Sequence, residues 1–190
     1  MRVNDAEIRL ETPSLRDRRR LSAIYREAFP PEERAPFWML WMRRKRPYVD
    51  LFAIRRGAET VGMLYVVSDG TLSYVFYLAV DAACRGQGIG SGTLAAAIRH
   101  YAGRRLFLAI EPLDPSAPNA KERERRRAFY LRNGFEDLHR RVQEGPVVFD
   151  VLGVGGDVDA AGYARLMERY MGKKAMQRFH IGMVEETSDK

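Results

Sequence analysis

The chain has 190 residues, a formal net charge of +7, 46% hydrophobic residues and 30% charged residues. This length and composition predict one folded domain and exclude a disordered protein or a fibrous repeat. The longest apolar runs, residues 61–67 and 74–80, are too short to cross a bilayer, and residues 1–10 hold no apolar signal core. Cys84 is the only cysteine, so no intrachain disulfide can form. We expect a cytoplasmic protein without a membrane segment.

The first half of the chain alternates between short strands and helices. A strand over residues 6–11 should precede two helices that prolines terminate. Three further strands in quick succession predict an antiparallel meander, and a strand–loop–helix–strand crossover follows it. The expected helices span residues 13–28, 36–46 and 88–102, and the strands that follow residue 48 span residues 49–56, 60–68, 71–80 and 105–111.

The second half begins with a proline-rich loop over residues 112–118. Asn119 and Glu122 have the spacing of a capping box at the start of a helix that ends at Asn133. Two strands, a last helix and a frayed tail complete the prediction. These segments are residues 136–143, 146–154, 159–171 and 183–190. We expect a single domain over residues 1–182, with a core over 49–137 and C-terminal strands and a helix over 138–182.

Three alternate glycines mark the most informative loop. Gly86, Gly88 and Gly90 follow a predicted strand and open a predicted helix, so several backbone N–H groups can converge where the helix dipole is positive. Because these positions lack a Cβ, a pyrophosphate can approach the main chain closely, and Arg85 adds a positive charge. The loop matches neither a P-loop nor the dinucleotide pattern GxGxxG, and the residues around Ser91 do not form a nucleophile elbow.

Two spaced signatures resemble those of the GNAT superfamily of N-acetyltransferases. The first is (Q/R)xxGx(G/A) at Arg85–Gly90, preceded by LxV at Leu78–Val80. The second is an aromatic-Tyr pair at Phe129 and Tyr130, followed after three residues by Gly134–Phe135. The resemblance implies an α/β fold with a mixed, mostly antiparallel central sheet, flanking helices and a splayed strand pair that holds the cofactor.

The resemblance also implies acetyl-CoA as the cofactor. In the family, amides of the glycine loop hold the pyrophosphate, and the preceding strand pairs with the pantetheine arm and offers an N–H group to the developing oxyanion. Carried over to this chain, the cofactor-binding residues are Leu78, Ala79, Val80, Arg85, Gly86, Gln87, Gly88, Ile89, Gly90 and Ser91.

The chemistry of acetyl transfer requires an acid and a base. An alkylammonium group must lose a proton before it attacks, and the leaving thiolate must gain one. Tyr130 matches the family tyrosine and is the candidate acid, with a packing role as its alternative. Glu111 is the candidate base, and a loop anchor is an equal alternative. The family often has Asn where this chain has Arg123, so the sequence departs from the family at that cofactor contact.

The acceptor side is expected in the loop between the first two helices, which walls the acceptor pocket in the family. Glu32, Glu33 and Trp38 there suit a cationic amine, although acidic residues also favour a helix start. His100, His139 and His180 lack metal-ligand spacing, so we expect no metal.

The predicted activity is N-acetyl transfer from acetyl-CoA to a primary amine of a small molecule or peptide, by direct attack in a ternary complex. A longer acyl donor or a hydroxyl acceptor is the alternative within enzymes. A CoA-binding sensor or a basic RNA-associated module is the alternative outside them, because a basic chain attracts polyanions. Nucleic acid is the less favoured partner, and a homodimer is an expectation from the family alone.

Overall fold

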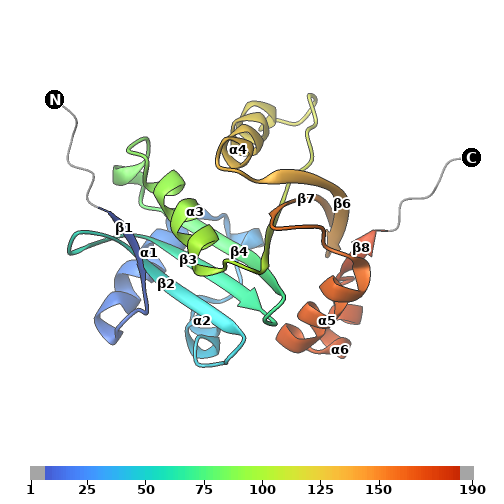
Figure 1. Ribbon diagram of the computed structural model, residues 1–190, viewed down its shortest axis with the longest axis horizontal. Helices are drawn as coiled ribbons and strands as arrows, with labels where there is room; N and C mark the ends of the chain where they lie inside the picture. The colour runs from blue at the N-terminus through green and yellow to red at the C-terminus, as the bar shows by residue number, and fades with distance from the viewer. Residues whose placement is uncertain (1–6, 185–190) are drawn as a thin grey trace, which may run out of the picture. The chain divides into compact units, whose positions relative to one another are not determined.

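The structure is a computed structural model that describes residues 7–184. The chain forms two compact units. Val75–Ala102 belongs with the chain up to Val67, and Ser68–Tyr74 belongs with the chain from Gly103 onward. Strand β4, Leu72–Val80, therefore contributes its first three residues to the second unit and the rest to the first (Figure 1).

The first unit is a sheet with helices on both faces. Strand β1 pairs antiparallel with β2, and β2 pairs antiparallel with β3, which is followed in the sheet by β4. Helices α1 and α2 lie on one side of these strands and α3 lies on the other (Figure 1). The elements other than β4 are β1 Ile8–Glu11, α1 Arg18–Ala28, α2 Phe37–Arg43, β2 Val49–Arg56, β3 Glu59–Ser68 and α3 Ile89–His100, with short 3-10 turns at Leu15–Asp17, Pro31–Glu33 and Ala82–Cys84.

Strand β3 forms the centre of this unit's core. Its residues from Val61 to Val67 are all buried, as expected of a strand that helices cover on both faces. Gly92 of α3 lets β1 approach the helix, because a Cβ there would lie 2.7 Å from Cγ1 of Ile8. The start of α3 is thereby fixed against the sheet.

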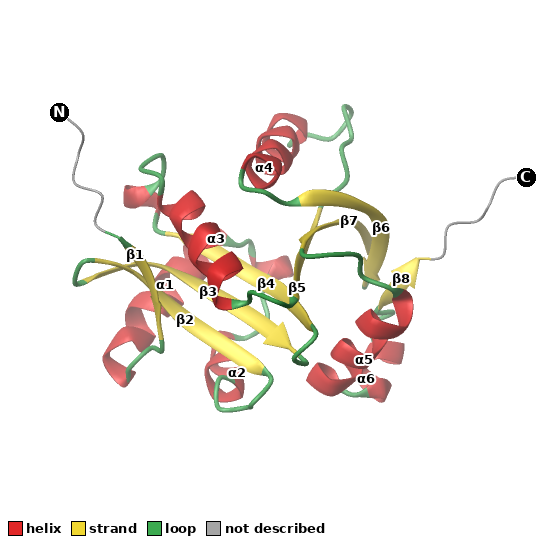
Figure 2. Cartoon of the chain, in the orientation of Figure 1, coloured by secondary structure: helices red, strands yellow, loops and turns green. Residues whose placement is uncertain are grey.

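The second unit carries the rest of the sheet. Leu72–Tyr74 pairs parallel with Arg105–Phe107, and every other ladder in this unit is antiparallel. The strand order from β4 onward is β5, β7, β6 and β8. Helix α4 lies on one side of these strands and α5 and α6 on the other (Figure 2). The elements are β5 Arg105–Ile110, α4 Ala120–Arg132, β6 Glu136–Glu144, β7 Val147–Val154, α5 Ala160–Met171, α6 Lys173–Arg178 and β8 Gly182–Val184.

The sequence predicted the fold class correctly: the sheet is mixed and mostly antiparallel, and helices flank it. The predicted strands and the α1 to α5 helices are present within a few residues of their expected ends. The splayed strand pair and the single-domain boundaries stay predictions. Of the first predicted strand, Ala6 lies outside the described residues, and so does the tail from residue 185. In the described part of the chain, no helix is long and apolar enough to span a membrane.

Two elements near the C-terminus were not predicted. Helix α6 has the sequence KKAMQR, which is short and lacks an apolar period. Strand β8 includes Met183 and Val184, which the prediction had assigned to the frayed tail. Its three residues are held by pairing with β6, where Val142 faces Met183. Such a strand depends on a partner from elsewhere in the chain, and local sequence does not encode that partner.

The predicted capping box at Asn119 is wrong. Asn119 does occupy the N-cap of α4, but its side chain makes no capping hydrogen bond. Its amide nitrogen donates to the carboxylate of Glu111, and its amide oxygen accepts from Arg123. Two charged partners, Glu111 at the end of β5 and Arg123 on α4 itself, therefore outcompete the local backbone donors.

Candidate functional site

The glycine loop has the conformation that its sequence requires. Gly86 and Gly88 have φ values of +75° and +77°, and Gly88 is the N-cap of α3. Residues with a Cβ rarely adopt this left-handed conformation. A Cβ built at either glycine would have no protein atom within 4 Å, so the space beside the loop is open. The backbone is thus accessible to a bulky ligand where a side chain would obstruct it.

The first backbone amides of α3 directly follow Gly88, beside which this space lies. The first hydrogen bond of the helix runs from Gly92 N to Gly88 O, at 2.9 Å. The amides of Ile89, Gly90 and Ser91 precede it, and N–H groups in the first turn of a helix have no intrahelical partner. Together with the positive end of the helix dipole, they form a site suited to an anion such as a pyrophosphate.

Asp81 fixes the turn between β4 and this loop. Its backbone N–H donates to the Val61 carbonyl at 2.9 Å, and its carboxylate accepts from Ala83 N at 3.0 Å. The side chain also forms an ion pair with Arg20 of α1. Because Asp81 is buried, these contacts hold the end of β4 in one position.

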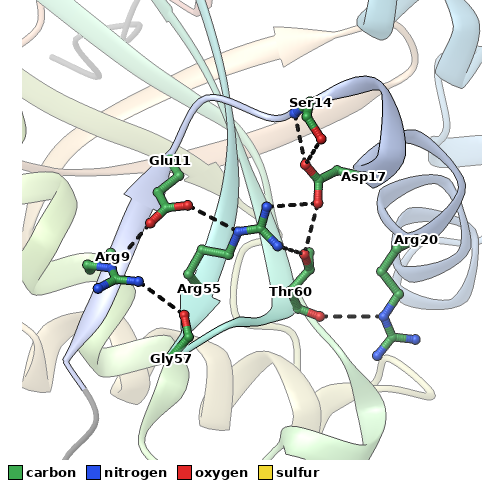
Figure 3. A network of polar contacts seen from close by, with 8 residues as sticks. All are labelled: Arg9, Glu11, Ser14, Asp17, Arg20, Arg55, Gly57 and Thr60. Atoms are coloured by element: carbon green, nitrogen blue, oxygen red, sulfur yellow. Dashed lines mark hydrogen bonds and ion pairs between the residues drawn. The ribbon is translucent and has the colours of Figure 1, made fainter.

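A polar network at one edge of the first unit supports Arg20 (Figure 3). Arg20 Nε donates to the Thr60 carbonyl at 3.4 Å, and the Thr60 hydroxyl donates to Asp17 at 3.1 Å. Arg55 lies 2.9 Å from the Asp17 carboxylate. Burial alone would raise the pKa of Asp17, but hydrogen bonds from Ser14 and Thr60 and the charge of Arg55 hold this pKa below its usual value. The network therefore favours an ionised Asp17.

Arg56 holds the loop from the end of β2, a contact that sequence reasoning missed. Its Nη1 donates to Gln87 Oε1 at 2.5 Å, and its Nη2 lies 3.8 Å from the sulfur of Cys84. Gln87 Nε2 in turn donates to the Ala83 carbonyl at 3.1 Å. No spacing rule connects Arg56 to a loop about 30 residues away, so only the fold shows the contact.

The strand before the loop presents both buried and accessible residues. Ala79 is buried, whereas Leu78 and Val80 are half-buried. Gly62 of β3 permits this arrangement, because a Cβ there would lie 2.4 Å from the Ala79 carbonyl oxygen. Arg85 Nε donates to the Val80 carbonyl at 3.3 Å, which directs the Arg85 side chain back along the strand.

The candidate acceptor residues lie in the same unit as the loop. Trp38 is 59% exposed, which is unusual for so large an apolar side chain. Glu33 is exposed, and its backbone carbonyl accepts a hydrogen bond from Tyr77. Glu32 belongs to the 3-10 turn at Pro31–Glu33, and its side chain lies outside the described part of the structure.

Tyr130 lies near the end of α4, in the second unit. Its ring contacts those of Phe129 and Phe135, with centroids 5.2 and 5.8 Å away. The Phe135 amide donates to the Tyr130 carbonyl at 3.2 Å, which closes the turn after the helix. Burial raises the pKa of Tyr130, and the positive charge of Arg126 opposes that shift. A tyrosine with a raised pKa keeps its proton at neutral pH.

Glu111 has four polar contacts. Arg123 and Arg126 each lie 2.9 Å from one of its oxygens, and Asn119 donates to both oxygens at 3.3 Å. Arg123 also donates to the Pro112 carbonyl at 3.0 Å. These contacts connect the end of β5 to the start of α4, so they favour the loop-anchor alternative for Glu111. They also engage Arg123 within the protein.

Among the described residues, no three His, Cys, Asp or Glu side chains gather as metal ligands. The absence of a metal stays a prediction. Cys84 is half-buried at the end of a 3-10 turn, beside Arg56.

The structure thus groups the predicted site residues in two sets. The loop residues, Leu78–Val80, Glu33 and Trp38 belong to the first unit, and Tyr130 and Glu111 belong to the second. Arg126 connects the second set, because it pairs with Glu111 and its charge acts on Tyr130.

Comparison with known proteins finds one matching domain family and several similar folds. Residues 47–137 match the family model of the acetyltransferase (GNAT) domain, a span that contains both signatures. No curated protein matches the chain. A putative acetyltransferase from the GNAT family of Bacteroides thetaiotaomicron has a similar fold, with a TM-score of 0.64, 23% identity, and coverage of 86% of this chain and 95% of that one.

Two further solved structures are similar in fold. The ribosomal-protein-S18-alanine N-acetyltransferase from Escherichia coli has a TM-score of 0.60 and 15% identity, with 80% of this chain and 96% of that chain covered. An aminoglycoside 6'-N-acetyltransferase complexed with coenzyme A has a TM-score of 0.62 and 16% identity, with 80% and 99% covered. With both signatures inside the matched span, the chain contains a GNAT acetyltransferase domain at residues 47–137.

Proposed function

We propose that this protein transfers the acetyl group of acetyl-CoA to a primary amine. The observation that carries the proposal is the loop at Gly86 and Gly88, with its left-handed glycines, open space and free amides at the start of α3. These features suit the pyrophosphate of coenzyme A. When bound, acetyl-CoA supplies an activated acetyl thioester.

The residues of the first unit bind and orient the donor. Amides from Arg85 to Ser91 hold the pyrophosphate, and Leu78, Ala79 and Val80 offer main-chain donors and acceptors to the pantetheine arm. A free N–H group of this strand stabilises the carbonyl oxygen of the acetyl group as negative charge develops on it. Removal of one such donor in other enzymes costs about 3 kcal/mol.

Tyr130 supplies the proton that the leaving thiolate needs. Its assignment depends on the Phe129–Phe135 signature. The hydroxyl is protonated at neutral pH, and burial, which raises its pKa, makes it a weaker acid than a free tyrosine. Tyrosine therefore enters the reaction in its protonated form.

The role of Glu111 has two versions. As a base, it takes the ammonium proton of the acceptor directly or through a water. To do so, one of its oxygens must exchange an arginine partner for that proton donor. As an anchor, it keeps its partners and holds the start of α4, and the contacts favour this version.

The acceptor is an amine of a small molecule or peptide that arrives as a cation. After it loses a proton, the neutral amine attacks the thioester directly in a ternary complex. Glu32, Glu33 and Trp38 attract the cationic form through charge and cation–π contact. Two of the similar solved structures are enzymes named for an aminoglycoside and for a ribosomal-protein alanine, and both names describe amine acceptors. A cytoplasmic location and a homodimer stay predictions.

The test is release of free thiol from acetyl-CoA in the presence of a panel of amines. The proposal expects amine-dependent release and an acetylated product of the expected added mass. If coenzyme A binds but no amine is acetylated, the result would favour the alternative of a CoA-binding sensor. If the protein binds RNA with an affinity that falls steeply with salt and does not change with coenzyme A, the result would favour the alternative of a basic RNA-associated module.

A further inference from the structure

Two tyrosines bind the backbone of one residue, Ala35, in the loop between α1 and α2. Tyr77 of β4 donates its hydroxyl proton to the Glu33 carbonyl at 3.3 Å and accepts from the Ala35 amide at 3.3 Å. Tyr25 of α1 donates to the Ala35 carbonyl at 3.1 Å. Both polar backbone groups of Ala35 are therefore bound by tyrosine hydroxyls. We call this arrangement of Tyr25, Tyr77 and Ala35 the tyrosine clamp.

The tyrosine rings are themselves fixed by packing. They meet edge to face, with centroids 5.0 Å apart and an interplanar angle of 87°. Phe29, just before the loop, lies 5.0 Å from the Tyr77 ring, and Phe37, just after it, lies 5.8 Å from the Tyr25 ring. Burial raises the pKa of Tyr25, and the nearby Tyr77 hydroxyl adds to the shift, so Tyr25 stays a donor. The clamp thus joins both ends of the loop to one aromatic cluster.

The position of Tyr77 in the chain relates the tyrosine clamp to both proposed substrates. Tyr77 directly precedes Leu78, the first of the strand residues assigned to the pantetheine arm. The loop that it holds contains Glu33 and leads into α2 with the exposed Trp38. One side chain therefore connects the strand proposed for the donor with the loop proposed for the acceptor.

We propose that Tyr77 is a positioning residue for the acceptor: its hydroxyl fixes the loop at Glu33 and Ala35 in the geometry that receives the amine. This inference rests on the proposed function, which assigns the loop to binding of the acceptor amine. The order of the loop itself does not depend on that function and can be measured separately.

The test compares Tyr77→Phe with a matched control, Tyr101→Phe. Phenylalanine at position 77 keeps the ring packing and removes both hydrogen bonds to the loop. The Tyr101 hydroxyl donates to Asp50 at 2.7 Å in the same unit, so its removal also deletes a hydrogen bond of a buried tyrosine, but in another place. The first readout is hydrogen exchange of the Ala35 amide, measured by NMR. Exchange should become at least about 5-fold faster in Tyr77→Phe and remain unchanged in Tyr101→Phe.

The second readout is steady-state kinetics with spermidine, tyramine and an alanyl peptide as acceptor probes. For each probe that the wild type acetylates, Tyr77→Phe should raise the acceptor KM by about 5- to 100-fold, as expected for two neutral hydrogen bonds. The kcat and the acetyl-CoA KM should stay within about 2-fold of the wild type. The control should leave all three constants near the wild type.

The two readouts separate failure of this inference from failure of the proposed function. Unchanged Ala35 exchange in Tyr77→Phe, equal acceleration in the control, or an equal rise of both KM values would overturn the role of Tyr77. If the wild type acetylates none of the probes and releases no thiol, the positioning role is rejected together with the proposed function. Ala35 exchange still decides whether the clamp orders the loop.

Discussion

Arg56 Nη1 lies 2.5 Å from Gln87 Oε1, so the last residue of β2 holds the middle of the glycine loop. The same guanidinium contacts Cys84, and Gln87 spans the loop to reach the Ala83 carbonyl. A loop that offers main-chain amides to a ligand binds more tightly when these amides are already in place, because less conformational entropy is lost on binding. Arg56 therefore contributes to the order of the proposed pyrophosphate site.

Replacing Arg56 by Gln should weaken coenzyme A binding. The variant loses the charged hydrogen bond to Gln87 and leaves the loop glycines unchanged. We expect the coenzyme A Kd, measured by calorimetry, to rise by about 3- to 30-fold. Arg18→Gln is the control, since it removes the same charge from an exposed position on α1. Equal weakening in both variants would mean that net charge, and not the contact with Gln87, determines affinity.

Gly88→Ala should weaken coenzyme A binding more than it lowers stability. Gly57→Ala is the matched control, because it should cost the same stability at a place outside the proposed site. Both glycines have positive φ values, +77° and +60°, and neither has an atom within 4 Å of a built Cβ. Each substitution should cost about 1–2 kcal/mol of backbone strain. Only the one at Gly88 places a methyl group beside the proposed pyrophosphate site, so we expect its coenzyme A Kd to rise about 10-fold or more. Equal coenzyme A affinity in the two variants would contradict the site.

Tyr130→Phe should lower turnover with little change in donor affinity. The variant keeps the ring contacts with Phe129 and Phe135 and loses the acidic proton. We expect kcat to fall by about 10- to 1000-fold, and the coenzyme A Kd to remain within about 2-fold. Thiol release and calorimetry provide the two measurements. A variant with wild-type turnover would remove Tyr130 from the role of acid.

Asp17→Asn should destabilise the protein at neutral pH and matter less in acid. Because hydrogen bonds and Arg55 lower the pKa of Asp17 in the folded state, its ionised form stabilises the fold above the usual pKa of 3.8. This contribution is lost as the pH falls through the folded-state pKa. We expect a loss of about 1.5–3 kcal/mol in urea unfolding at pH 7, and a smaller one at pH 3. Glu27→Gln, an exposed change on α1, is the control, and a pH-independent loss would contradict the role of charge.

Glu144→Gln should stabilise the protein at neutral pH, whereas Asp17→Asn should destabilise it. Burial raises the pKa of Glu144, although the Tyr74 and Tyr163 hydroxyls donate to its Oε1 at 2.6 and 2.9 Å and oppose the shift. Ionisation of this carboxyl therefore costs stability as the pH rises from its usual pKa of 4.5 through the folded-state pKa. Glutamine keeps an acceptor oxygen for both tyrosines and carries no charge.

We expect Glu144→Gln to raise the free energy of unfolding at pH 7 by about 1 kcal/mol, and to approach the wild type near pH 4. Urea unfolding across this range measures both effects. Glu136→Gln on the same strand is exposed and should change neither. Destabilisation by Glu144→Gln at pH 7 would show that the negative charge itself stabilises the second unit.

Much of the fold and the glycine loop could be predicted from the sequence, because their signals are short-range. Apolar periodicity marks β3 and α5 within single segments, and Gly88 follows a strand and opens a helix within a few residues. Backbone dihedral preferences act over the same distance, so the left-handed glycines of the loop are determined locally.

Only the tertiary structure decided which side chains support that loop and what Glu111 contacts. Arg56 meets Gln87 across 31 residues, Arg20 meets Asp81 across 61, and Tyr77 meets Ala35 across 42. Such pairs depend on strand register and helix packing, which no local pattern contains. Asn119 illustrates the difference: its spacing to Glu122 indicated a cap, but packing brought Glu111 within reach of its amide nitrogen, and Arg123, one turn along α4, donates to its amide oxygen.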